Sequence, residues 1–168
     1  MNISILAMVS LTGFLTLSLY AAAHDFRKLS IPNAVILTLL GGYLLLAAGS
    51  GWSQEEITSA MLAASIVLFA GFLVYSLGWS GAGDGKFAAV CTLWIGAAHT
   101  LDFLFLTTLI GAGLAITIVV VKRLRRSKHA TTGPAATPSR IAVPYGLAIS
   151  LAAFCMLPQS PWLSAVPA

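Results

Sequence analysis

Residues 57–77 read ITSAMLAASIVLFAGFLVYSL, a run of 21 residues without a charged side chain. A helix rises about 1.5 Å per residue and bilayer hydrocarbon is about 30 Å thick, so this run is long enough to cross a membrane. Five further apolar runs flank it, at residues 3–23, 32–48, 87–98, 103–121 and 141–157. The sequence therefore predicts an all-α integral membrane protein built as a bundle of six transmembrane helices. The run at 87–98 is short for a span.

The composition of the whole chain agrees with this class. Of its 168 residues, 58% are hydrophobic and 8% are charged, whereas soluble domains carry about 25% charged residues. Such a chain cannot cover a soluble surface, which excludes a soluble enzyme and a disordered chain. It also argues against a nucleic-acid partner, despite a pI near 9.4. We expect one membrane-embedded domain over residues 1–168, with the lipid bilayer as its surroundings.

The charges predict how the chain is oriented. Every Lys and Arg falls in the loops after the first, third and fifth runs: Arg27, Lys28, Lys86, Lys122, Arg123, Arg125, Arg126, Lys128 and Arg140. The opposite loops carry only acids, Glu55, Glu56 and Asp102. By the positive-inside rule the basic loops are cytoplasmic and both termini are periplasmic. Residues 122–140 are expected to form a basic cytoplasmic loop that contacts anionic lipid.

Two acids on the basic side are not explained by topology, Asp25 and Asp84. A carboxylate at a membrane boundary is costly unless it is paired or solvated, so each is a candidate functional group. The alternative is that each only caps a helix or pairs with a neighbouring cation, Asp25 with Arg27 or Lys28 and Asp84 with Lys86.

The surroundings of Asp84 favour a site. Residues 80–86 read SGAGDGK, with glycines at Gly81, Gly83 and Gly85. Glycine lets another chain approach closely, so such a loop could hold an acid against an extended peptide. The string does not fit a phosphate-binding loop, because the required glycine and hydroxyl positions are occupied by Ser80 and Phe87.

Two carboxylates at the same ends of different spans can meet in a bundle. If they approach closely, one keeps a proton while the other acts as a base, which allows a water to be activated and a leaving amide to be protonated. That is aspartic peptide hydrolysis, which needs no cofactor. No metal is expected either, since His99 and Asp102 are two possible ligands without a third.

These residues resemble those of the type IV prepilin peptidases. The resemblance rests on Asp25 followed by LSIPN at 29–33, on GAGDGK at 81–86, and on PYG at 144–146. Within that family the chain is similar to the small peptidases of Tad/Flp pilus systems, the CpaA/TadV type. It lacks the paired C-x-x-C motifs of larger members, so no methyltransferase activity is expected.

The resemblance implies a GxGD-type aspartic endopeptidase of the bacterial inner membrane that removes the leader from prepilin or pseudopilin precursors at the cytoplasmic face. Asp25 and Asp84 match the catalytic pair. Six further residues are candidates for substrate binding: Gly81, Gly83, Gly85, Lys86, Arg27 and Lys28.

Other functions are weaker fits to the residues. Residues 78–81, GWSG, match a serine intramembrane protease string, but such an enzyme needs a histidine base in a neighbouring span. A proton-coupled component of a secretion system expects acids near the middle of the membrane. A non-enzymatic scaffold would leave both acids dispensable.

Overall fold

The computed structural model describes residues 3–49, 51–128 and 143–161, and every regular element among them is helical. The helices are α1 (Ile3–Lys28), α2 (Asn33–Gly49), α3 (Gln54–Ser76), α4 (Ala82–Ile95), α5 (Thr100–Lys128) and α6 (Tyr145–Met156), with short 3₁₀ turns η1 (Ala97–His99) and η2 (Leu157–Gln159). The all-helical prediction is confirmed, and each predicted apolar run contributes one of the six helices. Residues 129–142, which hold Arg140 and most of the predicted basic loop, lie outside the described residues.

Two segments are long and apolar enough to cross a membrane, Gln54–Ser76 and Ala97–Leu124. Only 17% and 11% of their most apolar windows are buried inside the protein, which is unlike the core helix of a soluble domain. Helix α3 exposes large side chains along its length, among them Phe69 and Phe72. Trp52 and Trp79 flank it at its two ends, as aromatic residues do at membrane interfaces.

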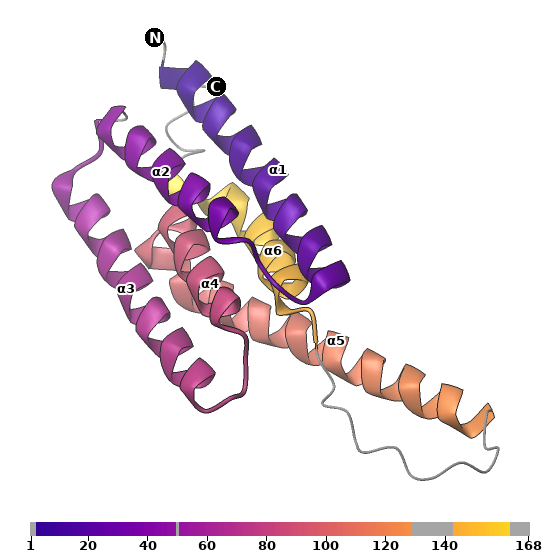
Figure 1. The fold of residues 1–168 in the computed structure, drawn as a ribbon. Helices are drawn as coiled ribbons and strands as arrows, with labels where there is room; N and C mark the ends of the chain where they lie inside the picture. The colour runs from indigo at the N-terminus through magenta and orange to yellow at the C-terminus, as the bar shows by residue number, and fades with distance from the viewer. Residues whose placement is uncertain (1–2, 50, 129–142, 162–168) are drawn as a thin grey trace.

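Helix α4 lies at the centre of the bundle and packs against α2, α3 and α6 (Figure 1). All residues from 87 to 96 are buried. Its Trp94 is the largest buried side chain, and its indole N–H donates to the Leu39 carbonyl of α2 at 3.1 Å. Because other helices cover most of α4, it does not need the length of a lipid-facing span. This explains the short apolar run in the sequence.

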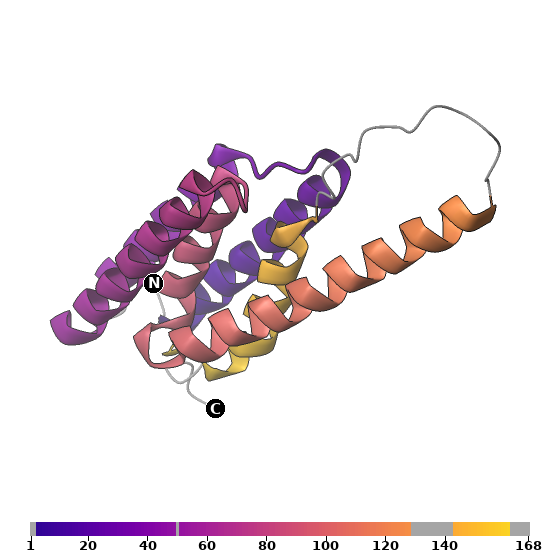
Figure 2. The same ribbon diagram turned by 90° about the horizontal axis from the view of Figure 1, so that it is seen from below.

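Helix α6 joins the remaining helices, since it packs against α1, α4 and α5. The first half of α5 lies along α6, whereas its C-terminal half extends away from the bundle (Figure 2). Residues 122–128, predicted as the start of a loop, instead continue α5 to Lys128. The sequence is uninterrupted by Gly or Pro there, so the helix persists beyond the apolar run.

Turn residues at one end of the bundle bring separate helices together. Helix α1 ends at Lys28 with Leu29 in the left-handed region (φ 52°), and α3 ends before Gly78 (φ 72°). The chain then re-enters as α2, α4 and α6 at the same end. We call this end the cleft end, and the end that holds η1 the opposite end.

Candidate active site

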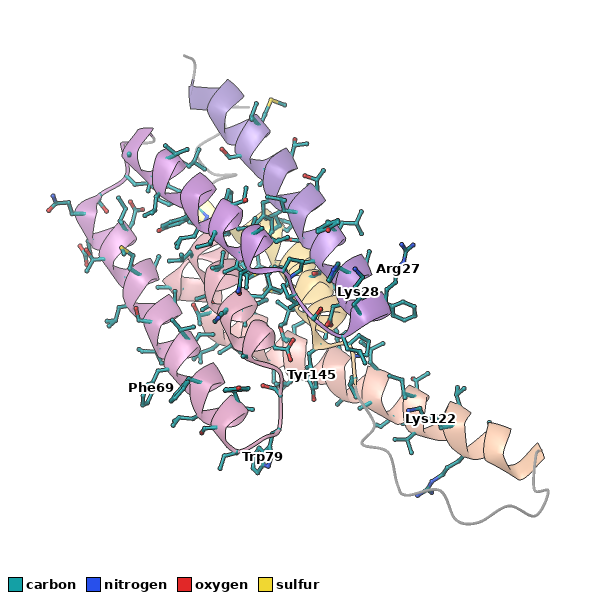
Figure 3. The ribbon with its side chains drawn as sticks, viewed as in Figure 1. Arg27, Lys28, Phe69, Trp79, Lys122 and Tyr145 are labelled. Carbon is teal, nitrogen blue, oxygen red and sulfur yellow. The ribbon has the colours of Figure 1, made fainter. Side chains whose placement is uncertain are left out.

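A cleft of about 600 Å³ lies at the cleft end, where three connections meet. It is lined by the chain after α1, by the turn between α3 and α4 with the first turn of α4, and by the start of α6. Asp25 and Asp84 both line it, although they come from different helices. Tyr145 of α6 lines it as well, and Figure 3 shows this residue between α4 and α5.

Asp25 is almost completely buried, with 3% of its surface exposed. Its Oδ2 accepts a hydrogen bond of 2.7 Å from the backbone N–H of Gly146, in the first turn of α6. A Cβ at position 146 would lie 2.9 Å from that same oxygen and from Asp25 Cβ, so only glycine fits. The helix N-terminus therefore both contacts and orients this carboxylate.

Helix α6 is itself fastened to α1. The buried Ser150 hydroxyl lies 2.9 Å from the Ser18 carbonyl of α1 and 2.8 Å from the Gly146 carbonyl of its own helix. These two contacts lie one turn from Gly146 and fix the position of α6 along α1. The bond to Asp25 thus belongs to a rigid contact between two helices.

Asp84 is held by its own helix. Gly81 is the N-cap of α4, and its N–H donates to Asp84 Oδ2 at 3.0 Å. The expectation of a glycine-rich loop is wrong for residues 82–86, because α4 begins at Ala82 and Asp84 sits in its first turn. An acid at this position is favoured because it satisfies an N–H that the helix leaves free.

The glycines around Asp84 serve close packing. A Cβ at Gly83 would lie 3.3 Å from Ile31 Cβ, which brings the chain after α1 against the start of α4. A Cβ at Gly85 would lie 2.9 Å from Gly71 Cα, so α3 and α4 approach backbone to backbone. The proposed contact of Gly81, Gly83 and Gly85 with substrate stays a prediction, and Gly85 faces α3 and does not line the cleft.

The turn after α1 is braced at the cleft. His24 Nδ1 lies 2.6 Å from the Ser30 carbonyl oxygen, to which the ring donates. The Leu29 N–H donates to the Asp25 carbonyl at 2.8 Å and keeps the left-handed turn closed. Leu29 is half exposed and lines the cleft, and its left-handed backbone conformation is one that a leucine adopts only when its surroundings enforce it.

Burial raises the pKa of both carboxyls, which lie beyond the apolar runs at 3–23 and 87–98. Burial raises the pKa of Asp84 to about 6; the Gly81 hydrogen bond opposes this shift, and the nearby charge of Asp25 adds to it. Burial also raises the pKa of Asp25, against the Gly146 hydrogen bond and the charge of His24. The charge of Asp25 therefore helps Asp84 to keep its proton up to a pH of about 6.

Of the three candidate cations only Lys86 lines the cleft. Arg27 and Lys28 are exposed in the last turn of α1, and Arg27 points away from the bundle (Figure 3). Among the described residues none of the three forms an ion pair with an acid. The ion-pair half of the alternative has no support in this geometry, whereas its capping half agrees with the bonds of Asp84 and Asp25 to the first turns of α4 and α6.

The geometry of the site gives little support to the alternative of a serine intramembrane protease. Ser80 lines the cleft, but in the described part of the chain no hydrogen bond joins it to a histidine. His99 lies in η1 at the opposite end, 3.8 Å from Asp102, and His129 lies outside the described residues. Within the described ranges no three metal-ligating side chains lie together.

Sequence reasoning missed the contact between Gly146 and Asp25. Residues 144–146 served there only as part of the family resemblance, whereas Gly146 lies against the carboxylate. Tyr145 was also missed; its ring is seated against Gly111 of α5, where a Cβ would lie 2.9 Å from the ring. The only available signal was the PYG string itself, because 121 residues separate Gly146 from Asp25.

The fold and the cleft define a helical protein with lipid-compatible helices and two carboxylates, from different helices, at one end. The family model of the Type IV leader peptidase family matches residues 12–116, which is more than half of the chain. The chain belongs to this family of membrane-associated peptidases. The matched region contains both aspartates and Lys86, and it ends before α6. No curated protein and no solved structure gave a match.

Proposed function

We propose that the protein is an aspartic endopeptidase that cleaves the leader from prepilin or pseudopilin precursors. The observation that carries this proposal is that Asp25 and Asp84, from α1 and α4, line one cleft, where the charge of Asp25 contributes to the raised pKa of Asp84. Asp25 is buried and Asp84 is half-buried, and neither has a cationic partner among the described residues, which makes both acids candidates for a catalytic role. Family membership supplies the substrate class, because leader peptidases act on such precursors.

In the proposed reaction the two carboxyls share one proton. The ionised carboxylate takes a proton from a water molecule, and the water oxygen forms a bond to the carbonyl carbon of the scissile peptide. The protonated carboxyl then gives its proton to the amide nitrogen as the C–N bond breaks. The products are a new carboxyl terminus on the leader and a new amino terminus on the mature segment. No cofactor takes part.

The hydrogen bonds in the site support the use of one carboxyl as an acid and the other as a base. Each carboxyl has its Oδ2 engaged by a backbone N–H, from Gly146 for Asp25 and from Gly81 for Asp84. The other oxygen of each carboxyl is left for water, for the substrate or for the partner acid. Fixing both groups beforehand avoids reorganisation during the reaction.

Substrate positioning is assigned to Lys86. It is the candidate cation that lines the cleft, two residues after Asp84, and an ammonium there can pair with an acidic side chain of the precursor. Arg27 and Lys28 are assigned to the membrane boundary, where basic side chains interact with anionic lipid.

The proposed orientation has six spans, both termini in the periplasm and the cleft at the cytoplasmic face of the bacterial inner membrane. Segregation of charge supports it, since the acids Glu55, Glu56 and Asp102 occupy the opposite end. Reporter fusions test it: a fusion within residues 129–140 should report the cytoplasm, and one at Glu55 the periplasm. The reverse result, or the same side for both, would contradict this topology.

Two finer assignments rest on the sequence alone. The likeness to Tad/Flp pilus peptidases assigns the substrates to Flp-type precursors. The lack of C-x-x-C motifs leaves leader removal, without methylation, as the activity of residues 1–168, which we treat as one peptidase domain.

The test of the function is coexpression with candidate prepilins followed by mass spectrometry of the precursor N-termini. We expect a new N-terminus at the leader boundary that is absent when the peptidase is omitted. No new N-terminus on any Flp-type or type IV precursor, with the peptidase present in the membrane, would contradict the proposal. An N-methyl group on the mature product would contradict the assignment of leader removal alone.

A further inference from the structure

An apolar groove runs from the cleft along the outside of α4. Helices α2 and α3 scarcely contact one another in the described part of the chain, whereas α4 packs against both. Two hollows of about 550 and 360 Å³ lie over α4, and both are lined by Ser65, Leu68 and Lys86. We call these two hollows the α4 groove.

The groove is continuous with the candidate active site. Ala82 and Lys86 line both the first hollow and the cleft, and the second hollow reaches Leu93. Residues 82–93 of α4 rise about 16 Å, or three helical turns. Near the cleft, Gly71 and Gly85 carry no side chain, so the backbones of α3 and α4 touch there. A helix leaving the cleft toward the membrane interior would enter this groove.

Charge identifies the occupant. The polar side chains that line the groove are Ser65, Tyr75 and Lys86, of which Lys86 alone is a cation and has no ion pair among the described residues. The Ser65 hydroxyl is already used, donating to the Met61 carbonyl at 2.8 Å. What fits is therefore an apolar helix with one carboxylate near the point where its chain enters the cleft. Lipid acyl chains match the apolar surface but do not continue into the cleft as a peptide.

We propose that the α4 groove binds the apolar helix of the precursor, with Lys86 pairing an acidic side chain where that helix meets the cleaved segment. This inference rests on the proposed function, since it takes the cleft as the place of cleavage. In a bilayer the contact is stabilised by packing and not by expulsion of water, so shape decides the affinity. A bulky side chain in the groove should therefore weaken binding of the precursor's apolar helix and leave binding of the cleaved segment unchanged.

The test compares two substrates with Ser65→Phe, which fills the position shared by both hollows. One substrate is a full-length precursor in membranes, and the other is a short peptide with the leader and cut site but no apolar helix. We expect KM for the full-length precursor to rise about tenfold, because the helix loses its packing, while cleavage of the peptide is unchanged. The control is Ala70→Phe, an equally bulky change at an exposed position of α3 outside the groove.

Photo-cross-linking gives a second measurement that does not depend on turnover. A benzoylphenylalanine at Phe69, which lines the groove and is 63% exposed, should trap the precursor helix in Asp84→Asn protein. The same probe at Phe105 of α5, which is 69% exposed, is the control and should not. Figure 3 shows Phe69 on the outer side of α3.

The outcomes are distinct. Unchanged KM for the full-length precursor, equal losses for both substrates, or adducts to lipid alone at Phe69 would each overturn the groove proposal. A wild-type protein that cleaves neither substrate would instead overturn the proposed function.

Discussion

The acids at the two ends of the bundle have different surroundings. At the opposite end, Glu56 accepts hydrogen bonds from the Ser53 N–H and hydroxyl in a capping box, and Asp102 is an exposed residue in the first turn of α5. These acids stabilise helix starts in contact with solvent. At the cleft end Asp25 and Asp84 also accept backbone N–H groups, but burial raises the pKa of each. The raised pKa of the two cleft acids makes them candidate catalytic groups.

The largest expected effect comes from removing either cleft acid. Asp25→Asn and Asp84→Asn should each abolish leader removal while membrane accumulation stays near normal, because asparagine keeps the size but cannot exchange a proton. Asp102→Asn is the matched control and should cleave normally. Mass spectrometry of precursor N-termini measures all three variants. Substantial cleavage by Asp25→Asn or Asp84→Asn would remove that residue from the catalytic pair.

Sequence patterns predicted the helices and both acids, for a physical reason. Apolar runs determine where helices form, and the charge pattern isolated Asp25 and Asp84 as acids without a topological role. The pattern could not predict that α4 begins at Ala82, because three glycines indicate a loop unless packing against α3 and Ile31 is known. Local strings describe neighbours along the chain, and packing overrides them.

The contact of Asp25 with α6 could not be predicted from the sequence, for a related reason. Gly146 has a role only because α6 packs on α1, and that pairing joins residues 121 positions apart. The same holds for Lys86, which could not be separated from Arg27 and Lys28 until the cleft was known.

The next effect tests whether Asp25 must be held in place. Gly146→Ala puts a Cβ 2.9 Å from the Asp25 carboxylate, which must then shift. We expect kcat to fall by up to about a hundredfold, the cost of misplacing a catalytic group by about 1 Å. The N–H of Gly146 lowers the pKa of Asp25, so weakening that bond should raise this pKa and move to higher pH whichever limb of the rate profile Asp25 sets. Gly113→Ala, which meets nothing within 4 Å, is the control.

For Gly146→Ala the measurement is kcat and the pH profile in purified protein. A normal kcat would contradict the positioning role. A lowered kcat with both limbs of the pH profile unmoved would indicate a structural defect without a change at the carboxylate.

A smaller effect should follow from removing the cation in the cleft. Lys86→Gln should lower cleavage efficiency about tenfold to a hundredfold, since a hydrogen bond to a charged group contributes about 1.5–3 kcal/mol. Lys122→Gln, an exposed lysine on α5, should have no effect, and Arg27→Gln and Lys28→Gln should cleave at the normal rate with correct topology. If Lys86→Gln also cleaves normally, the substrate is held through the backbone alone.

The smallest effect concerns stability and separates the two ends without any assay of cleavage. The pKa of Asp84 is about 6 in the folded protein, against an ordinary value of 3.8. The folded state therefore keeps this proton to higher pH than the unfolded state, so stability falls as pH rises from about 3.8 to about 6, and the loss persists above that range.

Asp84→Asn cannot ionise, yet its side-chain oxygen can still accept the Gly81 N–H. We expect its Tm in detergent to exceed that of the wild type by about 2–4 °C at pH 7.5, and the two values to converge near pH 4. Asp102→Asn should gain nothing at either pH, because that acid is exposed. A Tm for Asp84→Asn at or below the wild-type value at pH 7.5 would mean that burial does not destabilise the ionised carboxylate, and the contrast between the two ends would then rest on activity alone.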